Sequence, residues 1–261
     1  GHAALAQAAL DRAAALPDAP VFPARAEETA ALEYAVEARP HDARAHLLLG
    51  HAHAGRGRLQ EALRHWRVAV EHDPALGVAW RLIGLHAWKK DGRLEDAVEA
   101  YRRVTELRPY DQIAHRELAE ILAAMGRRPE AIALIEQAPK EPSPRYDIVL
   151  WLAEAYLVEQ RYDDCIDLLS VARFSNWEGV TKPHDIFVAA LVARGRGHFD
   201  AGRLDAALAD FQRALTYPEN LEVGAQYRLT DAEVRYWLGK TLHALGRVEE
   251  ARAAWREGAA Q

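Results

Sequence analysis

Residues 43–76, ARAHLLLGHAHAGRGRLQEALRHWRVAVEHDPAL, and residues 77–111, GVAWRLIGLHAWKKDGRLEDAVEAYRRVTELRPYD, are two copies of one pattern. Each copy carries a large apolar residue and Gly, then Gly, Ala, an aromatic residue, a small apolar residue and Pro, in that order. Two further copies begin at Gln112 and Tyr146, so the four starting points lie 34, 35 and 34 residues apart. A repeat of this length with small residues at helix contacts is typical of a solenoid of helix-turn-helix units.

The spacing within one copy predicts two helices that pack against each other. Ala62 and Trp66 are four residues apart, which places them on one apolar face of the second helix. Gly50 is expected to permit a close helix crossing, because a larger side chain would push the helices apart. Gly57 is expected to end the first helix and Pro74 the second. One such pair cannot bury its own apolar face, so the pairs must stack.

The pattern extends over most of the chain, with weaker copies toward the end. The predicted helix pairs are 43–76, 77–111, 112–145, 146–172, 184–218 and 231–259, joined by long loops at 173–183 and 217–230. Residues 3–42 are predicted to form a degenerate leading pair, and the start at Gly1-His2 instead of Met is expected to be a vector remnant. No segment alternates with a period of two, as a strand would. The predicted fold is therefore all-α, with about fourteen helices.

Composition narrows the class of protein. The net charge is −6, and acidic and basic residues are interspersed. A nucleic-acid partner is not expected, because nucleic-acid binding normally needs a basic face. No apolar run approaches the ~20 residues of a membrane helix, so no membrane association is expected. Cys165 is the only cysteine and is expected to be a buried small apolar residue.

The order of the repeated residues resembles that of the tetratricopeptide repeat (TPR) family. The resemblance implies a right-handed superhelical solenoid of about six to seven units, a scaffold for protein–protein interaction and not an enzyme. It also implies a concave groove lined by the first helices, which hold positions 2, 5, 9, 12 and 13 of each unit. Carried onto this chain, the main groove residues are Arg44, Leu47, His51, Arg81, Leu85, Trp88, Arg116, Glu120, Asp147, Leu150 and Glu154.

The groove positions also indicate what kind of partner to expect. Family members that clamp the C-terminal carboxylate of a chaperone carry Lys at position 5 and Asn at position 9. The corresponding pairs in this chain are Leu47 and His51, Arg81 and Leu85, and Arg116 and Glu120. A chaperone cofactor is therefore not expected. A mixed groove containing Arg81, Trp88 and Arg116 favours an extended or helical peptide with apolar and acidic anchors.

The long loops carry a second, narrower resemblance. Phe22-Pro23, the segment 174–179 and the segment 217–224 look like the C-terminal TPR region of certain large bacterial proteins. Those proteins have an N-terminal β-sandwich domain of unknown function before the repeats. We expect the two loops to emerge on one edge and to form a ledge. The ledge residues are Asn176, Trp177, Glu178, Asn220, Leu221 and Glu222.

Three functions remain open from the sequence. The first is a scaffold that binds a protein or peptide segment, which could be the N-terminal domain of its own parent protein. The second is an accessory helical domain that completes or supports a carbohydrate-active N-terminal domain. The third is a structural or self-associating spacer. A cytoplasmic location is expected for the chain.

Catalytic, cofactor and metal sites are not expected. No phosphate-binding loop, nucleophile elbow or zinc-protease motif occurs in the sequence. His46, His51 and His53 crowd one predicted helix, and metal sites use such clusters. However, His51 and His53 are two residues apart and point to different faces, while His46, His53 and His115 occupy positions of core aromatics. Packing accounts for them better than metal binding.

Overall fold

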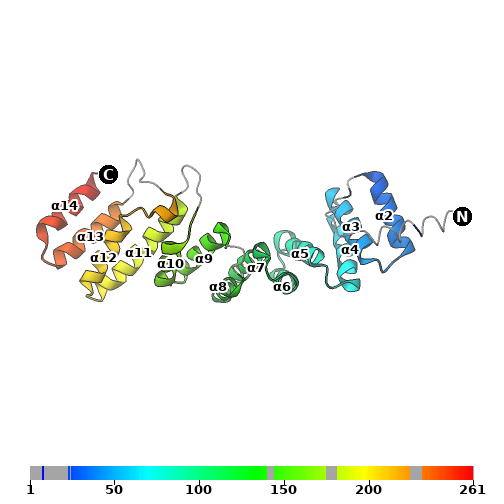
Figure 1. Ribbon diagram of the computed structural model, residues 1–261, viewed down its shortest axis with the longest axis horizontal. Helices are drawn as coiled ribbons and strands as arrows, with labels where there is room; N and C mark the ends of the chain where they lie inside the picture. Colours follow the sequence, from blue (N-terminus) through cyan, green and yellow to red (C-terminus); the bar gives the residue numbers. More distant parts are fainter. Residues whose placement is uncertain are drawn as a thin grey trace. The chain divides into compact units, whose positions relative to one another are not determined.

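The computed structural model describes residues 8, 23, 25–139, 144–174, 181–223 and 231–260. Over these ranges the chain forms thirteen α-helices, two short helical segments of other types and no β-strand (Figure 1). The predicted all-α class is confirmed. The chain divides into two compact units, residues 1–126 and 127–261.

Short connections join most of the helices, and the longest connections follow α10 and η2. The first unit contains α2 (Ala26–Ala38), α3 (Ala43–Gly55), α4 (Leu59–His72), α5 (Gly77–His86), the π-helical segment η1 (Ala87–Asp91), α6 (Leu94–Leu107) and α7 (Gln112–Ala124). The second unit contains α8 (Arg128–Gln137), α9 (Tyr146–Val158), α10 (Tyr162–Val171), α11 (Lys182–Asp200), α12 (Leu204–Ala214), the 3-10 segment η2 (Glu219–Leu221), α13 (Ala232–Ala244) and α14 (Val248–Ala259). Of the predicted leading pair, α2 lies within the described residues.

Successive helices pack against each other within each unit, as a solenoid requires. In the first unit the contacts run in chain order from α2 to α7. In the second unit α9 contacts α11 and α11 contacts α13, so the first helices of neighbouring pairs also touch. Across the described ranges, no helix combines the length and the apolar character needed to cross a membrane.

A glycine facing an aromatic ring joins the two helices of most pairs. A Cβ atom placed on Gly84 would lie 2.8 Å from Cδ2 of Tyr101, a residue that is completely buried. Such an approach is closer than carbon atoms tolerate, so only glycine fits there. The same contact recurs between Gly50 and Trp66, Gly195 and Phe211, and Gly239 and Trp255. The tight crossings predicted at Gly50, Gly84 and Gly239 are confirmed.

The turn between the two helices of a pair needs a left-handed residue. Gly57 has φ 74°, as expected for the residue that ends a first helix. The equivalent turns of other pairs use Gly92, Gly126, Gly202 and Gly246, all with positive φ. In the pair α9–α10, Gln160 takes this place with φ 58°. A side chain costs free energy in this conformation, so Gln160 is a strained position.

One residue more is present in the predicted repeat 77–111 than in its neighbours, and η1 accommodates it. The π-helical segment follows α5 directly and ends at Gly92, which is left-handed. A π-helical turn inserts a residue into a helix without breaking it. Trp88 lies in this segment, so the insertion changes its angular position relative to Arg81 and Leu85 on the same helix.

The core of the second unit contains the single cysteine. Cys165 is fully buried on α10, and its Sγ donates a hydrogen bond to the carbonyl oxygen of Ala153 at 3.4 Å. Burial raises the pKa of the thiol to about 12. The prediction of a buried small residue at this place is confirmed.

Candidate functional site

The residues predicted to line a groove lie on first helices and are all partly exposed. Eight belong to the first unit and three to the second. In the first unit they are Arg44, Leu47, His51, Arg81, Leu85, Trp88, Arg116 and Glu120, and in the second Asp147, Leu150 and Glu154. Leu47 also packs against the buried clusters around Trp66 and Val70, so its apolar surface is already partly used.

The first-unit surface is crossed by a two-point ion pair between α5 and α7. Arg81 Nε donates to Glu117 Oε2 at 2.8 Å, and Arg81 Nη2 donates to Oε1 at 2.7 Å. The Glu117 side chain is only 12% exposed. The hydrogen bonds that Arg81 donates to Glu117 raise the pKa of Arg81, and burial raises the pKa of the neighbouring Tyr101. An acidic anchor of a peptide would have to compete with Glu117 for this guanidinium.

The second arginine of the predicted groove is also paired. Arg116 forms an ion pair with Glu120, one turn later on α7. Trp88 is partly exposed, and Nζ of Lys89 lies 3.1 Å from its ring centroid. This contact has the geometry of a cation–π interaction. The surface therefore offers a partner mainly aromatic side-chain area, because most of its charged groups already pair with each other.

Two of the three predicted residues of the second unit show the same internal pairing. Asp147 accepts a hydrogen bond from Arg145 Nε at 3.0 Å. Glu154 of α9 pairs with Lys182 at the start of α11, which joins two neighbouring first helices. Leu150, which lies between Asp147 and Glu154 in the sequence, is partly exposed.

Histidines replace tryptophan in a recurring hydrogen bond. The ring N–H at position 4 of three consecutive repeats donates to the carbonyl oxygen of the proline six residues earlier. These bonds join Trp80 Nε1 to Pro74 at 3.0 Å, His46 Nε2 to Pro40 at 3.1 Å, and His115 Nε2 to Pro109 at 2.9 Å. Two of the predicted core histidines thus fix the start of a repeat.

Three imidazoles meet between α3 and α4. Nδ1 of His46 lies 2.9 Å from Nδ1 of His65, and the rings of His53 and His65 stack with centroids 5.3 Å apart. Burial lowers the pKa of His65 to about 4, and burial also lowers the pKa of His46 and His53. Within the described residues, no group of three or more His, Cys, Asp or Glu side chains is placed to hold a metal ion.

The described part of the predicted ledge is used inside the fold. Asn220 Nδ2 donates to the carbonyl oxygens of Leu169 and Ala172, at 2.8 and 2.7 Å. The N–H of Phe174 donates to the carbonyl oxygen of Asn220 at 3.0 Å. Leu221 is completely buried. These contacts close the C-terminal end of α10, so Asn220 and Leu221 are structural.

The other four ledge residues are Glu222 and three residues of the earlier loop. Glu222 is exposed, with a left-handed φ of 49°. Asn176, Trp177 and Glu178 lie outside the described residues, so the ledge as a whole stays a prediction.

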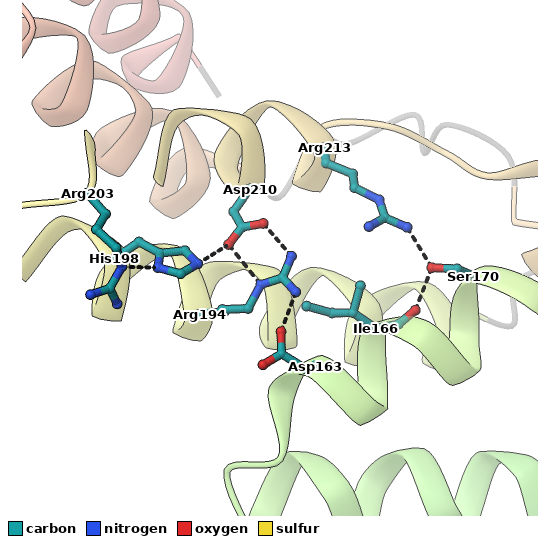
Figure 2. A network of polar contacts seen from close by, with 8 residues as sticks. All are labelled: Asp163, Ile166, Ser170, Arg194, His198, Arg203, Asp210 and Arg213. Carbon is teal, nitrogen blue, oxygen red and sulfur yellow. Dashed lines mark hydrogen bonds and ion pairs between the residues drawn. The ribbon is translucent and has the colours of Figure 1, made fainter. Parts of the chain in front are cut away.

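An ion network around the buried Asp210 ties three helices of the second unit together. Figure 2 shows Arg194 of α11 between Asp210 of α12 and Asp163 of α10. Arg194 donates twice to Asp210, at 3.0 and 2.6 Å, and once to Asp163, at 2.6 Å. Asp210 is only 5% exposed. His198 approaches Asp210 with Nε2 while its Nδ1 accepts a hydrogen bond from Arg203.

A cavity lies where α11, the end of α12 and the start of α13 meet. Its volume is about 340 Å³. It is lined by His184, Asp185, Val188, Ala189, Val192, Ala193, Arg196, Ala214, Leu215, Tyr217, Asp231, Glu233 and Val234. The groove positions of the repeats, continued from α9 onto α11 and α13, would have pointed to Ala189, Val192, Arg196 and Glu233. The groove residues predicted from the sequence end at the fourth repeat, so they do not include these cavity residues.

Comparison with known proteins gives the family. Two sequence models described as tetratricopeptide repeat match the chain, one over residues 90–146 and the other over residues 29–76, 61–112 and 192–261. The second model alone covers more than half of the chain. A curated relative, the tetratricopeptide repeat-containing protein trd-1 of Caenorhabditis elegans, is 30% identical over 99 residues. The match spans 38% of this chain and only 13% of that relative.

Solved structures agree on the fold. A chain in the structure of Naa15/Naa10 bound to HypK-THB superposes with a TM-score of 0.60 at 18% identity, covering 88% of this chain and 33% of that one. YrrB, described as a TPR protein with an unusual peptide-binding site, gives a TM-score of 0.51 at 15% identity over 72% of this chain and 92% of its own. Because the periodic glycines, the helix pairs and the matched sequence model coincide, the chain belongs to the tetratricopeptide repeat family.

Proposed function

We propose that this chain is a protein–protein interaction scaffold that binds a peptide or protein segment through the exposed faces of its first helices. TPR proteins generally act in protein–protein interaction and scaffolding. One observation carries the finer proposal. The second helices bury their large residues, such as Trp66, Tyr101 and Phe211, whereas the predicted groove residues of the first helices all stay partly exposed.

The chemistry of that face favours apolar and aromatic anchors in the partner. Leu85 and Trp88 are partly exposed, while Arg81 and Arg116 already hold carboxylates. Partly exposed apolar side chains on a rigid scaffold supply binding energy when a partner covers them. The predicted acidic anchors are therefore a weaker part of the proposal than the apolar ones.

A peptide library displayed on phage and selected against the immobilised full chain tests the proposal. Selected peptides are then titrated by fluorescence anisotropy against the full chain and its variants. Leu85→Glu and Trp88→Ala should weaken binding about tenfold or more. Arg103→Ala, on the exposed side of α6, removes a residue outside this face and should leave binding unchanged. Failure to select any peptide, or equal binding by all variants, would overturn the proposal.

The role in supporting a carbohydrate-active domain receives no comparable support. The ledge on which it rested uses Asn220 and Leu221 for internal contacts. The resemblance to large bacterial proteins with an N-terminal β-sandwich domain stays a prediction, as does a cytoplasmic location.

A further inference from the structure

We propose that the cavity between α11, α12 and α13 binds an arginine or lysine side chain of a protein partner. The inference rests on the proposed function and adds the chemistry of one anchor. This basic anchor differs from the acidic anchors predicted from the sequence. Those were expected to meet the positive charges of Arg81 and Arg116, whereas the cavity is lined by carboxylates.

The walls of the cavity suit the aliphatic part of a long basic side chain. Val188 and Val192 of α11, Val234 of α13 and Leu215 after α12 line it. A volume of about 340 Å³ falls at the lower end of the range of roughly 300–1,000 Å³ found for ligand pockets. Arginine and lysine bury their methylene stems against apolar surface while the charged head reaches polar groups.

The polar groups of the cavity are mostly acidic. Asp185 lies in the first turn of α11, Asp231 precedes α13 and Glu233 lies in its first turn. Among the described residues that line the cavity, Arg196 is the one arginine or lysine facing these three carboxylates, and Arg235, outside the lining, pairs with Asp231. A partner cation would therefore meet an excess of negative charge, and a partner carboxylate would be repelled.

Arg196 pairs only loosely with the lining carboxylates. Arg196 Nη1 is 3.9 Å from Glu233 Oε1, and both side chains are more than half exposed. Exposed pairs of this kind contribute little. The guanidinium of Arg196 also lies over the ring of Trp237, with its Cζ 4.9 Å from the centroid. This cation–π contact draws the Arg196 guanidinium toward Trp237 of α13.

The carboxylates retain capacity to accept hydrogen bonds. Asp231 Oδ2 accepts from Arg235 Nε at 3.0 Å, while Oδ1 is buried and accepts no hydrogen bond from the described residues. Asp185 accepts a hydrogen bond from Thr181 Oγ1 at 2.6 Å within the described part of the chain. A buried carboxylate oxygen without a donor is costly, so a donor brought by a ligand would be favoured.

An aromatic wall completes the site and favours arginine over lysine. The rings of His184 and Tyr217 stack with centroids 4.3 Å apart and planes inclined by 6°. His184 Nε2 is fixed 2.9 Å from the carbonyl oxygen of Thr216. A planar guanidinium stacks on aromatic faces and donates to carboxylates at the same time, which an ammonium group cannot do.

The test uses a series of acetylated, amidated pentapeptides Ala-Ala-Xaa-Ala-Ala, in which Xaa is Arg, Lys, norleucine or Glu. Binding to the full chain is followed by nuclear magnetic resonance titration, which also locates the peptide by the shifted amides. The Arg peptide should bind about tenfold more tightly than the norleucine peptide, and its affinity should fall as salt is added. The shifts should map to α11 and the start of α13.

Charge-removing variants sharpen the result. Asp185→Asn combined with Glu233→Gln should weaken binding of the Arg peptide about fivefold to tenfold. Asp167→Asn, an exposed acid on α10, gives a matched control that should leave binding unchanged. Circular dichroism spectra matching those of the unaltered chain show that the variants are folded.

The outcomes separate the two proposals. If library-selected peptides bind the first-unit face but the Arg peptide binds no better than the norleucine peptide, the basic-anchor inference is wrong and the scaffold proposal stands. If the Arg peptide shifts only amides away from α11 and α13, the inference is also wrong. If neither the selected nor the designed peptides bind, both proposals fail.

Discussion

Two glycines on one helix should respond to alanine in opposite directions. Gly195 and Gly197 both lie within α11, two residues apart, and neither has a positive φ. A Cβ on Gly195 would lie 2.8 Å from Cε1 of Phe211 and 3.2 Å from Cβ of Asp210. A Cβ on Gly197 would meet no atom within 4 Å. The pair therefore isolates interhelical packing from helix propensity.

The magnitudes follow from these distances. Alanine in place of a mid-helix glycine gains about 0.5–1 kcal/mol from reduced chain entropy. Gly197→Ala should show that gain. Gly195→Ala must also displace Phe211, which is fully buried, at an overpacking cost of about 1–3 kcal/mol. We expect Gly195→Ala to unfold more easily than Gly197→Ala by about 2 kcal/mol.

Urea denaturation of the full chain, followed by circular dichroism, measures the difference. A repeat protein can unfold in stages, so the midpoints are compared at matched slopes. Phe211→Leu should partly relieve the clash in a Gly195→Ala background, since the fourth repeat carries Ala153 and Leu169 at the same two positions. Equal stability of the two alanine variants would refute the packing argument.

Three further changes probe strain, acid sensitivity and the ion network. Gln160→Gly should raise the urea midpoint, because relief of about 1–2 kcal/mol of left-handed strain exceeds the added chain entropy of glycine, and an unchanged midpoint would contradict it. Burial lowers the pKa of His65 to about 4, so neutral His65 contributes its full share to folding stability above its unfolded pKa of about 6.5. That share is lost as the pH falls toward 4. Thermal melts should therefore show stability falling between these pH values, and falling less steeply in His65→Gln. The same slope in both proteins would show that the burial of His65 is not responsible. Arg194→Ala should cost about 3–5 kcal/mol, because Asp210 would keep a buried charge without its partner, whereas a loss below about 1 kcal/mol would mean that water replaces the guanidinium.

The fold could be predicted because its signals are local and repeated. Gly84 and Tyr101 recur with equivalents along the chain, and the same apolar spacing returns in each repeat, so the helix-pair architecture needed no long-range information. The hydrogen bond made by the ring at position 4 of the repeats was not predicted from the sequence. The separation of six residues between Pro40 and His46, or Pro109 and His115, is a sequence feature whose hydrogen bond becomes evident only in the structure.

The same periodicity correctly placed the residues of the candidate surface on first helices. It could not predict whether their side chains are free to contact a partner. Arg81 looked free for a partner and instead binds Glu117, a residue 36 positions away on another first helix. Asn220 was predicted to belong to a ledge between two loops and instead caps the end of α10. In both cases the partner is chosen by how neighbouring helix pairs stack, which no spacing within one repeat encodes.

The sequence by itself determined the helix pairs, the glycine crossings and the family, because these depend on residue size and periodicity along the chain. Only the tertiary structure decided which charges are paired and where a cavity remains. Asp185 and Glu233 are 48 positions apart, and they come to line one cavity because α11 packs against α13. Charge pairing and cavities are properties of surfaces assembled from several helices, so they appear only when the helices are packed.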